Sequence, residues 1–277
     1  MNYKSALSNE ERILNQYSGF LETTAVRFWS EAHIESFPFP VKGKPAENIS
    51  VVDNTVLGKR AEVFFEAMLA HSAEYRVVAS QIQLINDGIT EGEFDFIVEE
   101  VATNHLIHIE LAYKIYLLDG ELSTDQSQWV GPNRRDSLKL KWTKLINNQF
   151  PKLASPSAVD LLHKMGFENP SFRQALCMPM QLFIPFGKSE ESMGDLVPCY
   201  SGRWISFVEF ARQDWQGESF FIPEKEDWFV NPDKCEIWMS KTDILPSLSE
   251  IIESLRSPMV WRKPKYGSEQ RMFVTFW

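Results

Sequence analysis

The sequence lacks the features that would place it in a membrane or among disulfide-linked secreted proteins. No run approaches the ~18 apolar residues that a membrane-spanning helix needs, and the first residues contain no apolar secretory core. Only three cysteines occur, far apart in the chain, which favours reduced thiols over a disulfide framework or a paired-cysteine zinc site. We therefore expect a soluble, cytoplasmic protein without a membrane partner.

Several well-known catalytic motifs are also missing. A Gly-rich phosphate loop and a Gly-x-Ser-x-Gly elbow are both absent, so nucleotide hydrolases and serine esterases receive no support. Five histidines are present, and only His105 and His108 are close in sequence, on opposite faces of a predicted strand. His108 is either an assistant in catalysis or a core histidine with satisfied hydrogen bonds. Internal repeats and low-complexity stretches are absent as well.

Positive charge is scarce overall, but it is unevenly distributed. The net charge of -10 argues against indiscriminate binding of nucleic acid over the whole surface. Six acids and no base lie between Asp87 and Glu100, whereas six bases and only Asp136 as an acid lie between Gly131 and Lys152. An acidic strand beside a basic helix could hold a metal ion and a phosphate backbone, respectively. Ordinary surface charge is the alternative for the basic segment and for a second one that holds Arg256, Arg262, Lys263, Lys265 and Arg271.

The composition predicts a folded globular protein with ample material for a core. The 277 residues are 44% hydrophobic and include 20 Phe, 9 Trp and 7 Tyr. Residues 1–155 are expected to form N-terminal helices and a catalytic core. Residues 156–277 would supply the remaining core strand and an α+β extension, unless the whole chain is one continuous domain. The C-terminal tryptophans are either core residues or platforms on which bases stack.

Local patterns predict an α/β chain with α+β character. A capping box at Ser8 and Glu11 indicates an N-terminal helix, and Asn86-Asp87-Gly88 indicates a hairpin turn. Asp136 is the expected N-cap of the basic helix. The further expected helices are 24–32, 57–70 and 243–255, and the expected strands are 75–85, 93–99, 106–118, 175–185, 259–262 and 271–276.

The expected strand 106–118 divides cleanly into two faces. Apolar residues at every odd position from Ile107 to Leu117 share one face, while Glu110 and Lys114 share the other. Carboxylates in apolar strands are costly unless a metal ion or a lysine compensates their charge. Asp95 on the preceding hairpin has the same need, and Glu62 falls at the edge of the apolar arc of helix 57–70.

These residues match the needs of phosphodiester hydrolysis, which requires oxygen ligands for a metal ion and positive charge near the phosphate. Asp95 and Glu110 would bind Mg²⁺ or Mn²⁺, with Glu62 as an accessory ligand and Lys114 as the catalytic lysine. Two alternatives stay open. One is a structural Glu110–Lys114 ion pair with Asp95 capping a turn, and the other is a glycosidase that uses the paired carboxylates.

On these residues the chain resembles the PD-(D/E)XK nuclease superfamily. The likeness rests on a helix with an acid, a hairpin with Asp, a strand with Glu and a downstream Lys, and a basic helix. The segments Leu57–Glu62, Gly92–Phe96, Glu110–Lys114 and Gly131–Asn133 are more closely similar to an uncharacterised bacterial domain family that is assigned to that superfamily.

The resemblance implies a restriction-endonuclease-like core, with a central mixed sheet flanked by helices, and a β-rich C-terminal part. It also implies a Mg²⁺-dependent nuclease, acting on DNA in the first instance, with a homodimer left open. Backbone contacts would come from Arg134, Arg135, Lys141 and Lys144. The superfamily lysine usually lies two residues after the acid, where this chain has Ala112. That departure motivates the rival interpretation, a catalytically inactive nuclease-fold module that binds nucleic acid or a protein.

Overall fold

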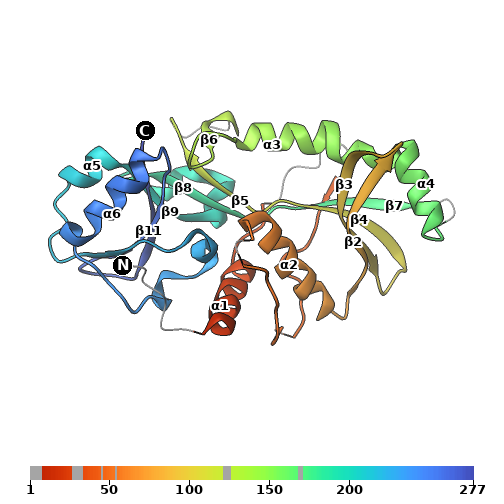
Figure 1. The fold of residues 1–277 in the computed structure, drawn as a ribbon, viewed down its shortest axis with the longest axis horizontal. Coiled ribbons are helices and arrows are strands. Elements are labelled where there is room, and N and C mark those ends of the chain that lie inside the picture. The colour runs from red at the N-terminus through yellow and green to blue at the C-terminus, as the bar shows by residue number, and fades with distance from the viewer. Residues whose placement is uncertain (1–7, 27–33, 45, 54, 121–125, 168–170) are drawn as a thin grey trace.

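The computed structural model describes residues 8–26, 34–44, 46–53, 55–120, 126–167 and 171–277, and these residues form two mixed β-sheets flanked by helices (Figure 1). The first sheet has the strand order β1-β7-β4-β3-β2. Its members are β1 (Ile34–Ser36), β2 (Tyr75–Asn86), β3 (Ile89–Glu100), β4 (His105–Leu111) and β7 (Phe172–Cys177). Strands β2, β3 and β4 are antiparallel, and β7 runs parallel to β4. The expected α/β class is confirmed.

The second sheet has the order β10-β11-β12-β9-β8-β5-β6. Its strands are β5 (Lys114–Leu118), β6 (Trp129–Val130), β8 (Met180–Pro185), β9 (Tyr200–Ser206), β10 (Ser219–Phe221), β11 (Met259–Lys263) and β12 (Gln270–Thr275). Helices α5 (Phe207–Arg212) and α6 (Lys241–Glu253) cover this sheet at the end of the molecule far from β2 (Figure 1). Strands from both sides of residue 155 contribute to each sheet.

One pair of parallel strands runs through both sheets. Strand β4 is followed after Ala112 and Tyr113 by β5, and β7 is followed after Met178 and Pro179 by β8. Backbone hydrogen bonds continue across the junction, from Ala112 N to the Cys177 carbonyl and from Lys114 N to the Pro179 carbonyl. The expected single strands 106–118 and 175–185 are therefore each divided in two. A physical reason is Pro179, which has no N–H to donate to a regular ladder.

Side chains continue to alternate between the two faces across this junction. All the odd-numbered residues from Ile107 to Leu117 belong to one core cluster, as predicted. Ala112, Tyr116 and Leu118 belong to a second cluster on the other face. Glu110 therefore points away from the main core, toward the helices that cover the second face.

Helices cover the two faces of the first sheet (Figure 1). On one face lie α1 (Asn9–Leu21), with the expected Ser8–Glu11 capping box, and α2 (Leu57–Ala70), which has the expected bounds. The other face carries α3 (Leu138–Lys144), the π-helical turn η2 (Leu145–Gln149), the 3-10 turn η3 (Phe150–Ala154) and α4 (Pro156–Lys164). The short 3-10 segments η1 (Gln126–Gln128), η4 (Glu190–Cys199), η5 (Lys225–Phe229) and η6 (Pro232–Lys234) complete the element order.

Two expected details differ from the structure or fall outside it. The N-cap of α3 is Ser137, whose hydroxyl accepts a hydrogen bond from Leu140 N, and not Asp136. The carboxylate of Asp136 instead accepts from Ser137 N and from the Lys114 ammonium. Most of the expected helix 24–32 lies outside the described residues. In the described part of the chain, no helix has the length and apolar character needed to cross a bilayer.

Alanine substitution at two helical glycines should change the stability of the protein in opposite directions. A Cβ at Gly19 of α1 would lie 2.0 Å from the Phe229 carbonyl oxygen of η5, whereas nothing lies within 4 Å of a Cβ at Gly58 of α2. Gly19→Ala should lower the free energy of unfolding by about 1–3 kcal/mol, and Gly58→Ala should raise it by about 0.5–1 kcal/mol. Urea denaturation followed by circular dichroism measures both. Equal effects of the two substitutions would contradict the close packing of α1 on η5.

Candidate active site

The predicted site residues converge where β3, β4 and β5 meet α2 and α3. Glu62 comes from α2, Asp95 from β3, Glu110 from β4 and Lys114 from the first position of β5. The negative charges of Glu110 and Glu62 both act on Asp95, and the charges of Asp95, Glu110 and Lys114 all act on Lys141. Residues that are separated by up to about 80 positions in sequence thus form one electrostatically coupled cluster.

Asp95 lies where strands β3 and β4 separate. The backbone pairing of the two strands ends at Phe96 and Ile109. Beyond that point, Oδ2 of Asp95 accepts a hydrogen bond of 2.9 Å from Leu111 N, in the place where a strand carbonyl would accept it. Burial, and then the negative charge of Glu110, raise the pKa of Asp95 to about 7, although the Leu111 hydrogen bond opposes the shift.

Glu110 is completely buried and its two oxygens have different partners. Nε2 of His108 lies 3.2 Å from Oε1, and Nε2 of Gln149 donates to Oε2. The Gln174 amide nitrogen faces Nδ1 of His108 at 3.4 Å, so Nδ1 is assigned as the acceptor and Nε2–H as the donor to Glu110. His108 is therefore a buried histidine with satisfied hydrogen bonds, and it orients the Glu110 carboxylate.

Lys141 of α3 is the lysine that lies beside the two strand carboxylates. Its ammonium donates to Oε1 of Gln149 at 3.0 Å. Burial and the neighbouring Lys114 lower the pKa of Lys141, while Glu110 and Asp95 oppose that shift. The sequence pattern assigned Lys141 only to backbone contacts. The spacing of Lys141 and Gln149 gives no direct signal for this contact, because eight residues at ~100° each would leave the two side chains about 80° apart on a regular α-helix.

Lys114 is close to this cluster but has another partner. Its ammonium forms an ion pair with Oδ2 of Asp136, which also lies 3.4 Å from the Tyr116 hydroxyl. The alternative structural interpretation, a Glu110–Lys114 ion pair with Asp95 capping a turn, therefore does not describe these contacts. Lys114 and Lys141 are nevertheless close enough for each positive charge to disfavour the other.

Glu62 belongs to a separate salt-bridge group at the edge of the site. Lys59 lies 2.9 Å from a carboxylate oxygen of Glu62 and 2.9 Å from one of Glu93. Burial raises the pKa of Glu62, the Lys59 hydrogen bond lowers it, and Glu93 and Glu110 raise it further. The Lys59 pair thus holds Glu62 beside the strand carboxylates.

The basic residues differ in their availability. Arg134, Arg135 and Lys144 are all exposed, but Arg134 already stacks on the Trp277 ring at 3.9 Å and forms an ion pair with Asp119 at 2.7 Å. In the C-terminal basic group, Arg262 pairs with Glu218 and Arg271 donates to backbone carbonyls of residues 229 and 230. Arg135 and Lys144 are therefore the better candidates for contacting a phosphate backbone.

The carboxylates suit a cation that needs few protein ligands. Within the described residues, no group of three or more His, Cys, Asp or Glu side chains is arranged to hold a metal ion. A site would rest on Asp95 and Glu110, and Mg²⁺ is commonly bound by one or two carboxylates together with water and substrate phosphate. Two hard oxygen donors whose charges repel each other fit such an ion.

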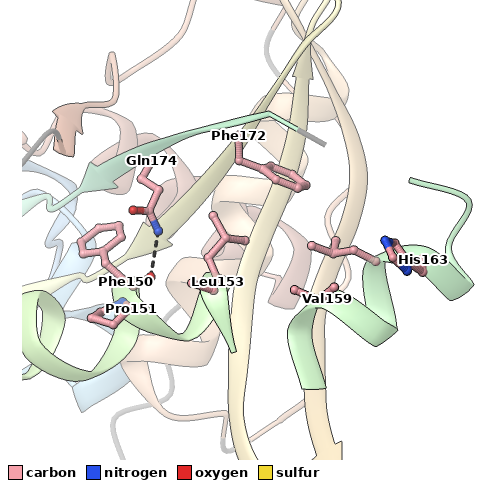
Figure 2. A pocket seen from close by; sticks show the side chains of 9 residues that line it. Phe150, Pro151, Leu153, Val159, His163, Phe172 and Gln174 are labelled. Atoms are coloured by element: carbon pink, nitrogen blue, oxygen red, sulfur yellow. Dashed lines mark hydrogen bonds between the residues drawn. The ribbon is translucent and has the colours of Figure 1, made fainter. Parts of the chain in front are cut away.

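A pocket of about 430 Å³ lies beside this cluster, between η3, α4 and β7 (Figure 2). Its walls are largely apolar and include Phe150, Leu153 and Phe172, and Gln174 donates from its wall to the Phe150 carbonyl at 2.8 Å. Since the Gln174 amide also faces His108, the pocket wall is connected through His108 to Glu110. The pocket borders the carboxylates through this wall and is not lined by them.

The model of a family described as Domain of unknown function (DUF1853) matches residues 41–275. No curated protein and no solved structure matches the chain.

Proposed function

Because the chain belongs to the DUF1853 family, whose description states no activity, we propose its function from the site itself. We propose that it is a divalent-cation-dependent phosphodiesterase that cleaves nucleic acid, with DNA as the first substrate class. The observation that carries this proposal is the meeting of Asp95, Glu110 and Lys141 where two strands separate. The order of elements around them also supports it, since α2, the β2–β3 hairpin, β4 and the basic helix α3 occur in the order that the superfamily resemblance implies.

In this proposal Asp95 and Glu110 hold Mg²⁺ or Mn²⁺. When bound, such an ion lowers the pKa of a water ligand and neutralises charge on the phosphate. Lys141 places its ammonium beside the scissile phosphate, where it stabilises the charge that develops there. The Leu111 N–H orients Asp95, and His108 orients Glu110. Exposed Arg135 and Lys144 contact the nucleic-acid backbone outside the site.

The proposal is tested by incubating the protein with double-stranded DNA, single-stranded DNA and RNA, each with Mg²⁺, Mn²⁺ or EDTA. Cleavage that needs the cation and stops with EDTA is the expected result. Titration of Mn²⁺ by calorimetry provides an independent measurement. An absence of both cleavage and Mn²⁺ binding at millimolar concentration would contradict the proposal.

The two lysines of the site should differ in their importance. Lys141→Met is expected to lower the cleavage rate by roughly 10²–10³-fold, because it removes the ammonium beside Asp95 and Glu110. Lys114→Met is expected to lower the cleavage rate much less, since the Lys114 ammonium is already paired with the Asp136 carboxylate. Cleavage rates at saturating cation, compared with melting temperatures, measure the difference. The opposite order of effects would assign the catalytic lysine to position 114.

A second candidate function is a nuclease-fold module that binds nucleic acid without cleaving it. Two observations favour it: Ala112 occupies the usual lysine position, and both Glu110 oxygens have protein hydrogen-bond partners. Retained affinity for DNA together with no Mn²⁺ binding would support this candidate.

A further inference from the structure

Gln149 occupies an unusual position between the lysine and the glutamate of the site. Its amide nitrogen donates to Oε2 of Glu110, and its amide oxygen accepts from the Lys141 ammonium at 3.0 Å. A neutral amide thus lies between the Lys141 ammonium and the fully buried Glu110 carboxylate and is hydrogen-bonded to both. The partially positive amide hydrogens of Gln149 thus occupy the place beside Glu110 that a bound cation would take.

The backbone around Gln149 is also irregular. The π-helical turn η2 ends at Gln149, between the α-helix α3 and the 3-10 turn η3. Single π turns within α-helices occur frequently at functional sites. Rewinding a π turn to α-helical geometry changes the register by one residue, which rotates a side chain by roughly 100° about the helix axis. Such a change would carry the Gln149 amide away from Glu110.

Space for this change exists on the side of η3. The pocket of about 430 Å³ is lined by Phe150, Pro151, Leu153 and Ala154, the residues that directly follow Gln149 (Figure 2). Closely packed segments resist displacement because neighbouring atoms must move as well. A void against one side of η3 removes part of that resistance, so the pocket and the π turn together give η2 and η3 room to move.

We propose that Gln149 is the gate of the cation site. In the cation-free protein its amide is hydrogen-bonded to the Glu110 carboxylate and blocks it, and the amide moves away from Glu110 when Mg²⁺ or Mn²⁺ binds. The gate rests on the proposed cation-dependent function and adds a control step to it. Gln149 is thus a positioning residue, which acts through Glu110 and Lys141. It makes cation binding depend on the rearrangement of η2.

The first test compares Gln149→Met with the unchanged protein by Mn²⁺ calorimetry in the absence of nucleic acid. Methionine keeps the chain length but removes both hydrogen bonds, so the variant should bind Mn²⁺ about tenfold more tightly, as expected when a competing hydrogen bond to a charged group is lost. Asn148→Met, at an exposed position of the same π turn, is the matched control and should leave the affinity unchanged. Equal or weaker binding by Gln149→Met would overturn the gate.

A second measurement follows the backbone directly and needs no variant of Gln149. Addition of Mn²⁺ to the unchanged protein should change the rate of hydrogen exchange over residues 145–150 as the turn rearranges, and Asp95→Asn should abolish that change. Mn²⁺ binding without any change in exchange overturns the gate and leaves the proposed function standing. If neither the unchanged protein nor Gln149→Met binds Mn²⁺ or cleaves nucleic acid, the proposed function fails and the gate fails with it.

Discussion

Asp95→Asn is expected to lower the rate of cation-dependent DNA cleavage by roughly 10²–10³-fold without lowering the melting temperature at neutral pH. Asparagine keeps a carbonyl oxygen that can accept the hydrogen bond from Leu111 N. It removes a negative charge that lies close to Glu110 and Glu62. The substitution thus deletes a cation ligand and relieves charge repulsion at the same time, so catalysis and stability should change in opposite directions.

The measurement pairs cleavage rates with thermal melts, and Asp160→Asn on the exposed surface of α4 is the control that should change neither. Glu110→Gln should also abolish cleavage, but at a cost of about 1–3 kcal/mol in stability. The cost arises because the new amide N–H₂ must face either His108 or Gln149, and both are donors to Glu110. A strong loss of stability in Asp95→Asn would show instead that Asp95 has a structural role.

The second large expected effect is that titration of Asp95 makes the stability of the protein depend on pH. The pKa of Asp95 in the folded protein is raised from 3.8 to about 7, so the folded state binds a proton that the unfolded state releases. Stability from this group is therefore complete below pH ~4, falls as the pH rises through about 7, and is constant above that value. The loss amounts to roughly 4 kcal/mol at most, since the shift from 3.8 to about 7 spans about three pKa units and each unit corresponds to about 1.4 kcal/mol.

The difference in unfolding free energy between Asp95→Asn and the unchanged protein isolates this contribution from the other titrating groups. The difference should grow as the pH rises from about 4 to about 7 and stay constant above that value, because asparagine does not ionise. Mn²⁺ added at pH 8 should reduce it again, since a ligand that binds only the folded state stabilises that state. A difference that stays constant with pH would contradict the burial and charge crowding of Asp95.

The helices and strands near the site could largely be predicted, because their signals are local. The apolar positions of residues 57–70 and the Asn86-Asp87-Gly88 turn gave α2 and the β2–β3 hairpin. Alternation along residues 107–117 correctly divided the two faces, since side-chain direction depends only on position along a strand. The class of the fold followed from these elements.

The partners of the charged groups could not be predicted, because they depend on tertiary contacts. Whether Lys114 pairs with Glu110 or with Asp136 is decided by the path of the chain from β6 into α3, which local periodicity does not specify. Lys141 and Gln149 reach Glu110 through a π turn, and a helical projection at 3.6 residues per turn does not anticipate that change of register. The candidate acids were accessible to sequence reasoning, whereas the lysine and amide that complete the site were not.

The shared pair of strands has a consequence for biosynthesis. Strands β4 and β5 end at residue 118, but their parallel neighbours β7 and β8 begin only at residue 172. A chain growing on the ribosome must therefore extend by more than 50 residues before either half can close its sheet. Until then the β4 and β5 edges keep unpaired backbone groups that invite association with other chains. The first sheet therefore becomes complete only when β7, which ends at Cys177, has been synthesised, and the second sheet only when β12, which ends at Thr275, has followed.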